Sequence, residues 1–258
     1  MMFLDAVSSE WLKRRRSLTT WLVVGAAGFV PAIITLARFR RIDAVAAAYR
    51  RPEFWELLWR QAWESMALMI LPLSVMLLVS LITQLEDRNN GWKQLHAAPI
   101  TLPAIFAAKL SVILILSLGV LILHTAALYV AAVVPPLLLG AVDMPVRAIP
   151  LAAFMRRNLD FLIDASPIVA IQYALALRFR TFVAPLAIGM ALWIFSIGTM
   201  SWNYNYLIPY SYAGIDYLAV EYQRPRPLPA SPRAIAAAGF VVFTLAGYLV
   251  FASRRDKG

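Results

Sequence analysis

The feature that most constrains this chain is a series of apolar stretches long enough to cross a lipid bilayer. A membrane-spanning helix needs about 20 mostly apolar residues. Such stretches lie at about 18–36, 66–85, 108–132, 161–178, 182–202 and 234–252. We therefore expect an all-α integral membrane protein, with six membrane-spanning helices in a single transmembrane domain over residues 1–258.

Composition supports the class of polytopic membrane proteins. Of the 258 residues, 61% are hydrophobic and 15% are charged, whereas soluble domains are about 45–50% apolar and about 25% charged. The net charge is +10, and the basic residues lie between apolar stretches. We therefore expect membrane lipids with anionic headgroups as partners, and no nucleic acid. The absence of cysteine excludes thiol catalysis and thiolate metal sites.

The positions of Lys and Arg indicate the orientation in the membrane. Six spans put both termini on one side. With cytoplasmic termini, the 24 basic residues divide equally between the two sides. All the Lys residues are then cytoplasmic, and the run Lys13–Arg16 directly precedes the first span. Because the first helix usually dominates orientation, we expect both termini in the cytoplasm.

The first 16 residues have the pattern of an amphipathic helix on the inner membrane surface. Apolar side chains recur at three- or four-residue spacing, at Phe3, Leu4, Val7, Trp11 and Leu12. A helix of this kind with a basic polar face binds in the membrane interface. We assign Trp11, Lys13, Arg14 and Arg15 to this interfacial helix. A plain positively charged anchor is the compatible alternative.

The sequence lacks the common motifs for nucleotide binding and for metal or serine catalysis. It contains no G-x-x-x-x-G-K-[ST] phosphate loop, no H-E-x-x-H and no G-x-S-x-G. Its two histidines, His96 and His124, are 28 residues apart. We therefore expect no catalytic residue, no metal site and no cofactor on this chain.

A few polar residues within or near the spans are candidates for an intramembrane site or an exit path. His124 lies inside the third span, and Asp160 and Asp164 are four residues apart, on one helix face. Intramembrane ionisable groups are costly and are often functional. The alternatives are a hydrogen bond from His124 across a helix interface, and Asp residues that only mark the outer end of the fourth span. We expect Lys109 to snorkel to the inner surface.

Aromatic residues gather in the two outer loops. One group lies in or beside residues 37–62: Tyr49, Phe54, Trp55, Trp59 and Trp63. The loop at 203–232 contains six Tyr, among them Tyr204 and Tyr206. Trp and Tyr concentrate at the level of lipid headgroups, which is our first interpretation. The alternative is an aromatic surface at the mouth of an exit path that includes Tyr204 and Tyr206.

A polar stretch, QLEDRNNGWKQLHAAPITLPAIFAAKL at 84–110, separates the second span from the third. Its pattern predicts a short cytoplasmic helix over about 86–98, ended by Pro99. Glu86, Asp87, Arg88 and Lys93 give this helix both signs of charge. A Trp flanked by Arg and Lys is typical of protein interfaces, so we interpret the helix as a docking element. The alternative is an ordinary interfacial loop with Trp92 among the headgroups.

This polar stretch resembles the loop between spans two and three in permease subunits of type-2 ABC exporters. More narrowly, it is similar to the small permeases of the lantibiotic-immunity and peptide-export group. The matching residues are Glu86, Trp92, Lys93, Pro99 and Lys109. The start, SSEWLKRRRSLTTWLVV, resembles the family's amphipathic helix before span one. The segment at 166–190 resembles the family's turn between spans four and five, through Arg178, Phe179, Phe182, Pro185 and Gly189.

The resemblance implies a permease with six spans and cytoplasmic termini in the bacterial cytoplasmic (inner) membrane. Two such permeases, identical or related, would join two copies of a separate cytosolic ABC ATPase that binds ATP and Mg. Helix 86–98 would be the coupling helix in a cleft of the ATPase. Its coupling residues would be Glu86, Asp87, Arg88, Trp92, Lys93, Leu95 and Pro99. The complex would export a hydrophobic or peptide substrate from the cytoplasm or inner leaflet.

Two alternatives from other classes stay open at this point. A membrane-embedded enzyme would use His124, Asp160 and Asp164 as acid–base groups, which requires that they meet in one cavity. A six-span scaffold or sensor would use the docking helix without transporting anything.

Overall fold

The computed structural model describes residues 2–12, 17–88, 101–139, 145–179, 181–222 and 228–253. Regular structure in these ranges is helical. The longer helices are α2 (Leu18–Arg40), α5 (Leu71–Arg88), α7 (Leu102–Leu139), α8 (Leu151–Arg178) and α11 (Pro232–Ala252). The shorter ones are α1 (Met2–Leu12), α3 (Ile42–Tyr49), α4 (Phe54–Ser65), α9 (Val183–Gly198) and α10 (Tyr212–Tyr222). Single turns form η1 (Met66–Ile70), η2 (Asn205–Leu207) and η3 (Pro209–Ser211).

Within the described ranges, five helical segments are long and apolar enough to cross a membrane: Leu18–Arg40, Phe54–Gln84, Leu102–Leu138, Leu151–Arg178 and Pro232–Ala252. The prediction of an all-α, multi-pass membrane protein is thereby confirmed. Helix α9 lies within the predicted span at 182–202 and has 16 residues. At a rise of 1.5 Å per residue it extends about 24 Å, less than the hydrocarbon thickness of about 30 Å. A sixth crossing therefore stays a prediction.

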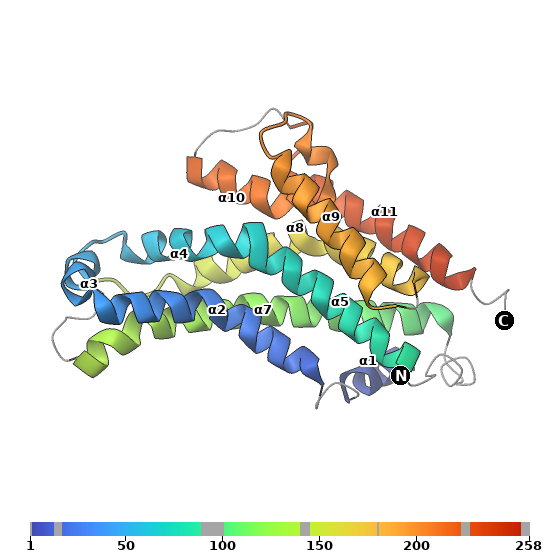
Figure 1. Ribbon diagram of the computed structural model, residues 1–258, viewed down its shortest axis with the longest axis horizontal. Coiled ribbons are helices and arrows are strands. Elements are labelled where there is room, and N and C mark those ends of the chain that lie inside the picture. The colour runs from blue at the N-terminus through green and yellow to red at the C-terminus, as the bar shows by residue number, and fades with distance from the viewer. Residues whose placement is uncertain are drawn as a thin grey trace.

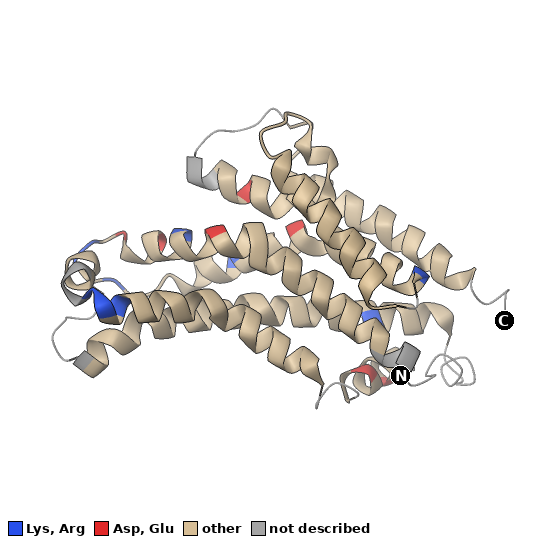
Figure 2. Ribbon diagram, in the orientation of Figure 1, with Lys and Arg blue, Asp and Glu red and all other residues tan. Residues whose placement is uncertain are grey.

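The long helices form a bundle with two distinct ends (Figure 1). At one end lie α1, the last turn of α5, the first turn of α7 and the last turn of α11; we call it the α1 end. At the opposite end lie α3, the start of α4 and the last turn of α7. Helix α8 packs against α5, α7, α9, α10 and α11, so it forms the centre of the bundle. Figure 2 shows long stretches of these helices without charged residues, as a hydrocarbon environment requires.

The second apolar span begins earlier than the sequence pattern predicts. Helix α4, η1 and α5 follow one another without a break, so the helical segment runs from Phe54 to Gln84. Trp55, Trp59 and Trp63 are 5%, 1% and 0% exposed. Trp63 stacks on Phe161 of α8, with 4.5 Å between ring centroids. The expectation that these Trp residues lie among headgroups is wrong, because they are buried inside the bundle. Trp55 stacks on Tyr129 of α7, whereas Trp59 and Trp63 lie against α8.

Prolines in the long helices shape the contacts between them. A proline has no N–H, so the carbonyl four residues earlier loses its helical donor. Within hydrocarbon such a carbonyl needs another partner. In the described helices, the carbonyls left open in this way belong to Ala27, Leu68, Ala131, Ala132 and Ile163, four residues before Pro31, Pro72, Pro135, Pro136 and Pro167.

Each of these carbonyls accepts a hydrogen bond from a side chain. The donors, in the same order, are His124 Nδ1 at 3.0 Å, Trp193 Nε1 at 2.8 Å, Arg38 Nη1 at 3.3 Å, the Tyr49 hydroxyl and Ser166 Oγ at 2.7 Å. Four of the five bonds join different helices. The prolines therefore create polar connections between helices inside an apolar bundle.

Candidate coupling site

The predicted coupling residues lie at the α1 end. Glu86, Asp87 and Arg88 form the last turn of α5, so this part of the predicted 86–98 helix continues the preceding span. Trp92, Lys93, Leu95 and Pro99 lie outside the described residues, as do Lys13, Arg14 and Arg15. Helix α7 begins at Leu102. The stretch between α5 and α7 therefore leaves and returns to the bundle at the α1 end (Figure 1).

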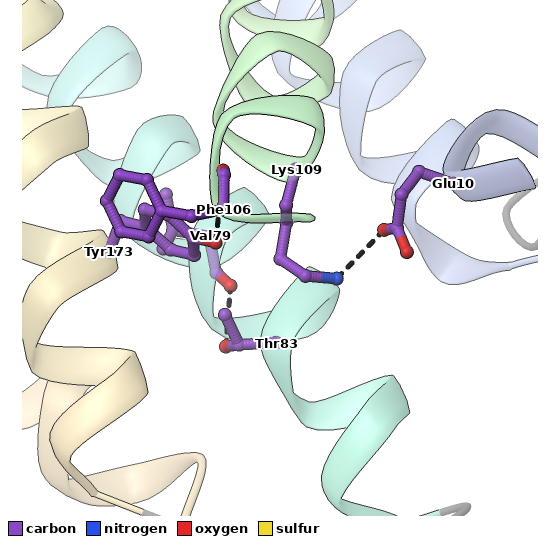
Figure 3. Close-up of polar contacts among 6 residues, drawn as sticks. All are labelled: Glu10, Val79, Thr83, Phe106, Lys109 and Tyr173. Carbon is purple, nitrogen blue, oxygen red and sulfur yellow. Dashed lines mark hydrogen bonds and ion pairs between the residues drawn. The ribbon is translucent and has the colours of Figure 1, made fainter. Parts of the chain in front are cut away.

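Helix α1 packs on the first part of α7 through a buried ion pair (Figure 3). Lys109 Nζ lies 2.8 Å from Glu10 Oε2, and the two side chains are 1% and 6% exposed. The expectation that Lys109 snorkels to the inner surface is therefore wrong. Helix α1 covers it and supplies the opposite charge that a buried ammonium needs.

The start of α7 is also fixed to the helices on its other side. The hydroxyl of Tyr173, on α8, donates to the Phe106 carbonyl at 3.4 Å. The Phe106 ring lies 4.9 Å from the ring of Tyr173 and 5.9 Å from that of Phe251 on α11, measured between centroids. Figure 3 shows Tyr173 and Glu10 on opposite sides of this part of α7. A displacement at the start of α7 would therefore act on α1, α8 and α11 together.

Helix α1 presents one buried and one exposed face at this site. Ala6 and Glu10 are buried, whereas Leu4, Trp11 and Leu12 are exposed. Trp11 is thus exposed, and its place in the membrane interface stays a prediction. The pattern lets α1 touch the headgroup region with one face and α7 with the other.

His124 has a structural role in this fold. It is fully buried, and its Nδ1 lies 3.0 Å from the Ala27 carbonyl that Pro31 leaves open. Because a carbonyl only accepts, Nδ1 carries the proton. The ring also meets Trp63 edge-on, at 5.7 Å between centroids. The hydrogen bond across a helix interface, the second of the two sequence interpretations, is the one that the geometry supports.

Asp160 and Asp164 belong to a second polar cluster, where α8, α10 and α11 meet. Arg233 lies 3.3 Å from an Asp160 oxygen and 3.6 Å from an Asp216 oxygen. Asp164 is fully buried, and its two carboxyl oxygens have no hydrogen-bond partner among the described residues. Burial raises the pKa of the Asp216 carboxyl above its ordinary value, and the Arg233 guanidinium opposes that rise.

This cluster does not bring His124 together with Asp160 and Asp164, the acid–base groups that the membrane-embedded enzyme would use. The described partners of His124 are Ala27 and Trp63, whereas Asp160 and Asp164 lie with Asp216 and Arg233. Over the part of the chain that is described, no group of three His, Cys, Asp or Glu could hold a metal ion. Sequence reasoning missed Asp216 and Arg233, although charges beside a span that holds two Asp could have signalled them.

The two Tyr residues proposed for an exit path lie between α9 and α10. Tyr204 is exposed and Tyr206 half-buried, with 6.2 Å between their ring centroids. Trp202 lies beside Tyr204, at 5.6 Å. Three other Tyr of this segment, Tyr210, Tyr212 and Tyr217, are buried. Among the Tyr residues of this segment whose exposure the structure describes, those at 204 and 206 therefore offer an aromatic surface, together with Trp202.

Comparison with known proteins identifies a family. A sequence model of a family described as ABC-2 family transporter protein matches residues 6–196. The matched range contains both Glu10 and Lys109, the whole segment between α5 and α7, the helices α2 to α8 and most of α9. No curated protein and no solved structure matches the chain.

Proposed function

Because this chain belongs to the ABC-2 family of transporter proteins, we propose that it exports a hydrophobic or peptide substrate from the cytoplasm or inner leaflet. As the membrane-spanning permease, it would use ATP that a separate ABC ATPase hydrolyses. Two permeases, identical or related, would form the path. The complex would lie in the bacterial inner membrane, with both termini of this chain in the cytoplasm. The resemblance to the lantibiotic-immunity group makes amphipathic antimicrobial peptides the first substrates to test.

The observation that best supports this proposal is the buried Glu10–Lys109 pair at the α1 end. The segment after α5 is the one that resembles a coupling helix, and α7 begins directly after it. Lys109 lies in the second turn of α7 and is held by α1. Force applied by an ATPase to residues 86–98 would therefore pass into α5 and α7 at once, and through Lys109 into α1.

We propose that this chain works by helix displacement and takes no part in the chemistry of ATP hydrolysis. Glu86, Arg88, Trp92 and Lys93 contact the ATPase, and closure of the ATPase around ATP displaces the end of α5 and the start of α7. The contacts of Phe106 with Tyr173 and Phe251 carry that displacement to α8 and α11. The bundle then opens a path outward for the substrate.

The test is an uncoupling experiment on the purified complex of the permease with its ATPase. Trp92→Ala or Glu86→Lys should leave membrane insertion intact while ATP hydrolysis no longer drives peptide uptake into inverted vesicles. Arg147→Gln, a charge change on an exposed residue far along the chain, serves as the matched control. Unchanged uptake and unchanged ATPase association in both coupling variants would contradict the proposal.

A further inference from the structure

An apolar groove runs between α8, α9, α11 and the turn η3. Its volume is about 400 Å³, within the range of small-molecule sites. The residues that line it include Ala174, Leu192, Tyr210, Phe243, Val250 and, from the last turn of α8, Arg178. Ala246, also in the lining, and Arg178 are exposed, so the groove opens at the surface of the bundle.

The polar groups in the wall of this groove are used within the protein. The Tyr210 hydroxyl donates to Gln172 Oε1 at 3.1 Å, and Gln172 Nε2 donates to the Pro185 carbonyl at 2.8 Å. Gln172 is fully buried. Apart from Arg178, the described lining therefore offers an occupant apolar side chains and a Tyr210 hydroxyl that already donates, which favours a hydrocarbon chain.

Arg178 gives the groove one charged rim. It is the last residue of α8, and its guanidinium lies 5.8 Å from the centroid of the Phe179 ring. A guanidinium has five N–H donors in a planar fork, so it can serve a phosphate in addition to another partner. The groove thus combines an apolar wall with an anion-binding group at the end where α8 ends.

We propose that this groove binds one acyl chain of an anionic membrane phospholipid, whose phosphate Arg178 holds. Helices α8 and α11 are both candidate membrane spans, so lipid chains surround the opening of the groove. Basic pockets between transmembrane helices select anionic headgroups. The site is separate from the coupling segment, and its test needs neither ATP nor the ATPase.

The test is lipid retention by the purified full-length chain, measured by native mass spectrometry. Delipidated protein receives phosphatidylglycerol or phosphatidylcholine with the same acyl chains. The wild-type chain should prefer phosphatidylglycerol, and Arg178→Gln should reduce that preference about tenfold, the order of one charge-assisted hydrogen bond. Ala246→Leu, which fills the groove, should reduce retention of both lipids. Arg147→Gln removes the same charge elsewhere and should change nothing.

Four results would overturn the proposal. Arg178→Gln could retain phosphatidylglycerol as the wild type does, or Arg147→Gln could lose it equally. Displacement of the lipid by soluble glycerol phosphate would show that the phosphate alone is the ligand. A co-purified amphiphile that is not a lipid, occupying the groove, would make it a cargo site instead.

A second measurement needs no variant and holds even if a substitution prevents folding. Phosphatidylglycerol with a photoreactive group in its acyl chain is added to the wild-type protein and illuminated. Crosslinks should map to peptides from 171–178 and 243–250, which face the groove. Crosslinks spread evenly over the lipid-exposed helices, α2 included, would contradict the site.

Discussion

At the scale of single residues, the main polar contacts join positions that are distant in the sequence. Glu10 and Lys109 are separated by 99 residues, and His124 and Ala27 by 97. Each contact meets a specific physical need: a buried charge requires its opposite, and a carbonyl before a proline requires a donor. Substitutions at these positions therefore test whether the buried charge and the open carbonyl are the reasons for the contacts.

The ion pair gives the first prediction. Lys109→Met leaves the Glu10 carboxylate buried beside an apolar side chain, so it should destabilise the protein by about 3–5 kcal/mol. Glu10→Lys with Lys109→Glu restores opposite charges and should recover most of the loss. The measurement is the thermal unfolding midpoint in detergent. If this double variant were no more stable than Lys109→Met, the ion pair would not hold α1 on α7.

The histidine gives the second prediction. His124→Phe removes the donor to the Ala27 carbonyl and should cost about 1–3 kcal/mol. In a Pro31→Ala background, residue 31 regains its N–H and serves that carbonyl itself, so the cost of His124→Phe should shrink toward zero. Unfolding midpoints of the four proteins in the cycle measure the coupling between the two positions. Equal costs of His124→Phe in both backgrounds would refute the explanation of His124 by Pro31.

At the scale of elements, Gly189 lets α9 approach α8 and α5 closely. A Cβ at Gly189 would lie 2.5 Å from Gln172 Oε1 and 2.7 Å from Met76 Sδ. Gln172 and Met76 are fully buried, and Gln172 already makes two hydrogen bonds, so neither side chain can move at small cost. Close approach at Gly189 also brings Pro185 within reach of Gln172.

The third prediction compares two glycines of the same helix. Gly189→Ala should lower the free energy of unfolding by about 1–3 kcal/mol, as expected for overpacking. Gly198→Ala should change it by less than about 0.5 kcal/mol, because a Cβ there meets nothing within 4 Å. Unfolding midpoints in detergent distinguish the two. Equal effects would mean that α9 does not pack as described.

Elements differ in how far the sequence predicts them. Helices α2 and α11 follow from apolar runs of span length, and both begin within two residues of the predicted start. The continuous helix from Phe54 could not be read in this way, because Glu56, Arg60 and Glu64 interrupt its apolar pattern. Its Trp residues are buried against α7 and α8, contacts that periodicity does not encode. The Glu10–Lys109 pair was missed for the same reason.

At the scale of the whole molecule, the α1 end and the segment between α9 and α10 differ in what they offer. The α1 end carries the buried ion pair and the return of the chain from α5 to α7 (Figure 1). The segment between α9 and α10 carries the aromatic surface of Trp202, Tyr204 and Tyr206. The proposed coupling role requires the α1 end to face the cytoplasm, where an ATPase is found.

The fourth prediction concerns this orientation. The chain has no cysteine, so a single introduced one can be labelled without background. In spheroplasts, a membrane-impermeant maleimide should label Gln223→Cys, whereas Asn89→Cys should react only after lysis. The reason is that the proposed orientation puts the loop after the second span in the cytoplasm and the Tyr-rich loop outside. Labelling of Asn89→Cys in intact spheroplasts would reverse the orientation and remove the basis for coupling.

Docking of the segment after α5 on an ABC ATPase is the basis of the proposed function, and site-specific crosslinking can detect it. A photoreactive amino acid is placed at Trp92, or at Tyr204 as the control, in the affinity-tagged chain expressed with its ATPase in native membranes. If the segment docks there, illumination should join the ATPase to the chain at Trp92 and not at Tyr204. A crosslink to the ATPase at Tyr204, or only lipid adducts at Trp92, would contradict it.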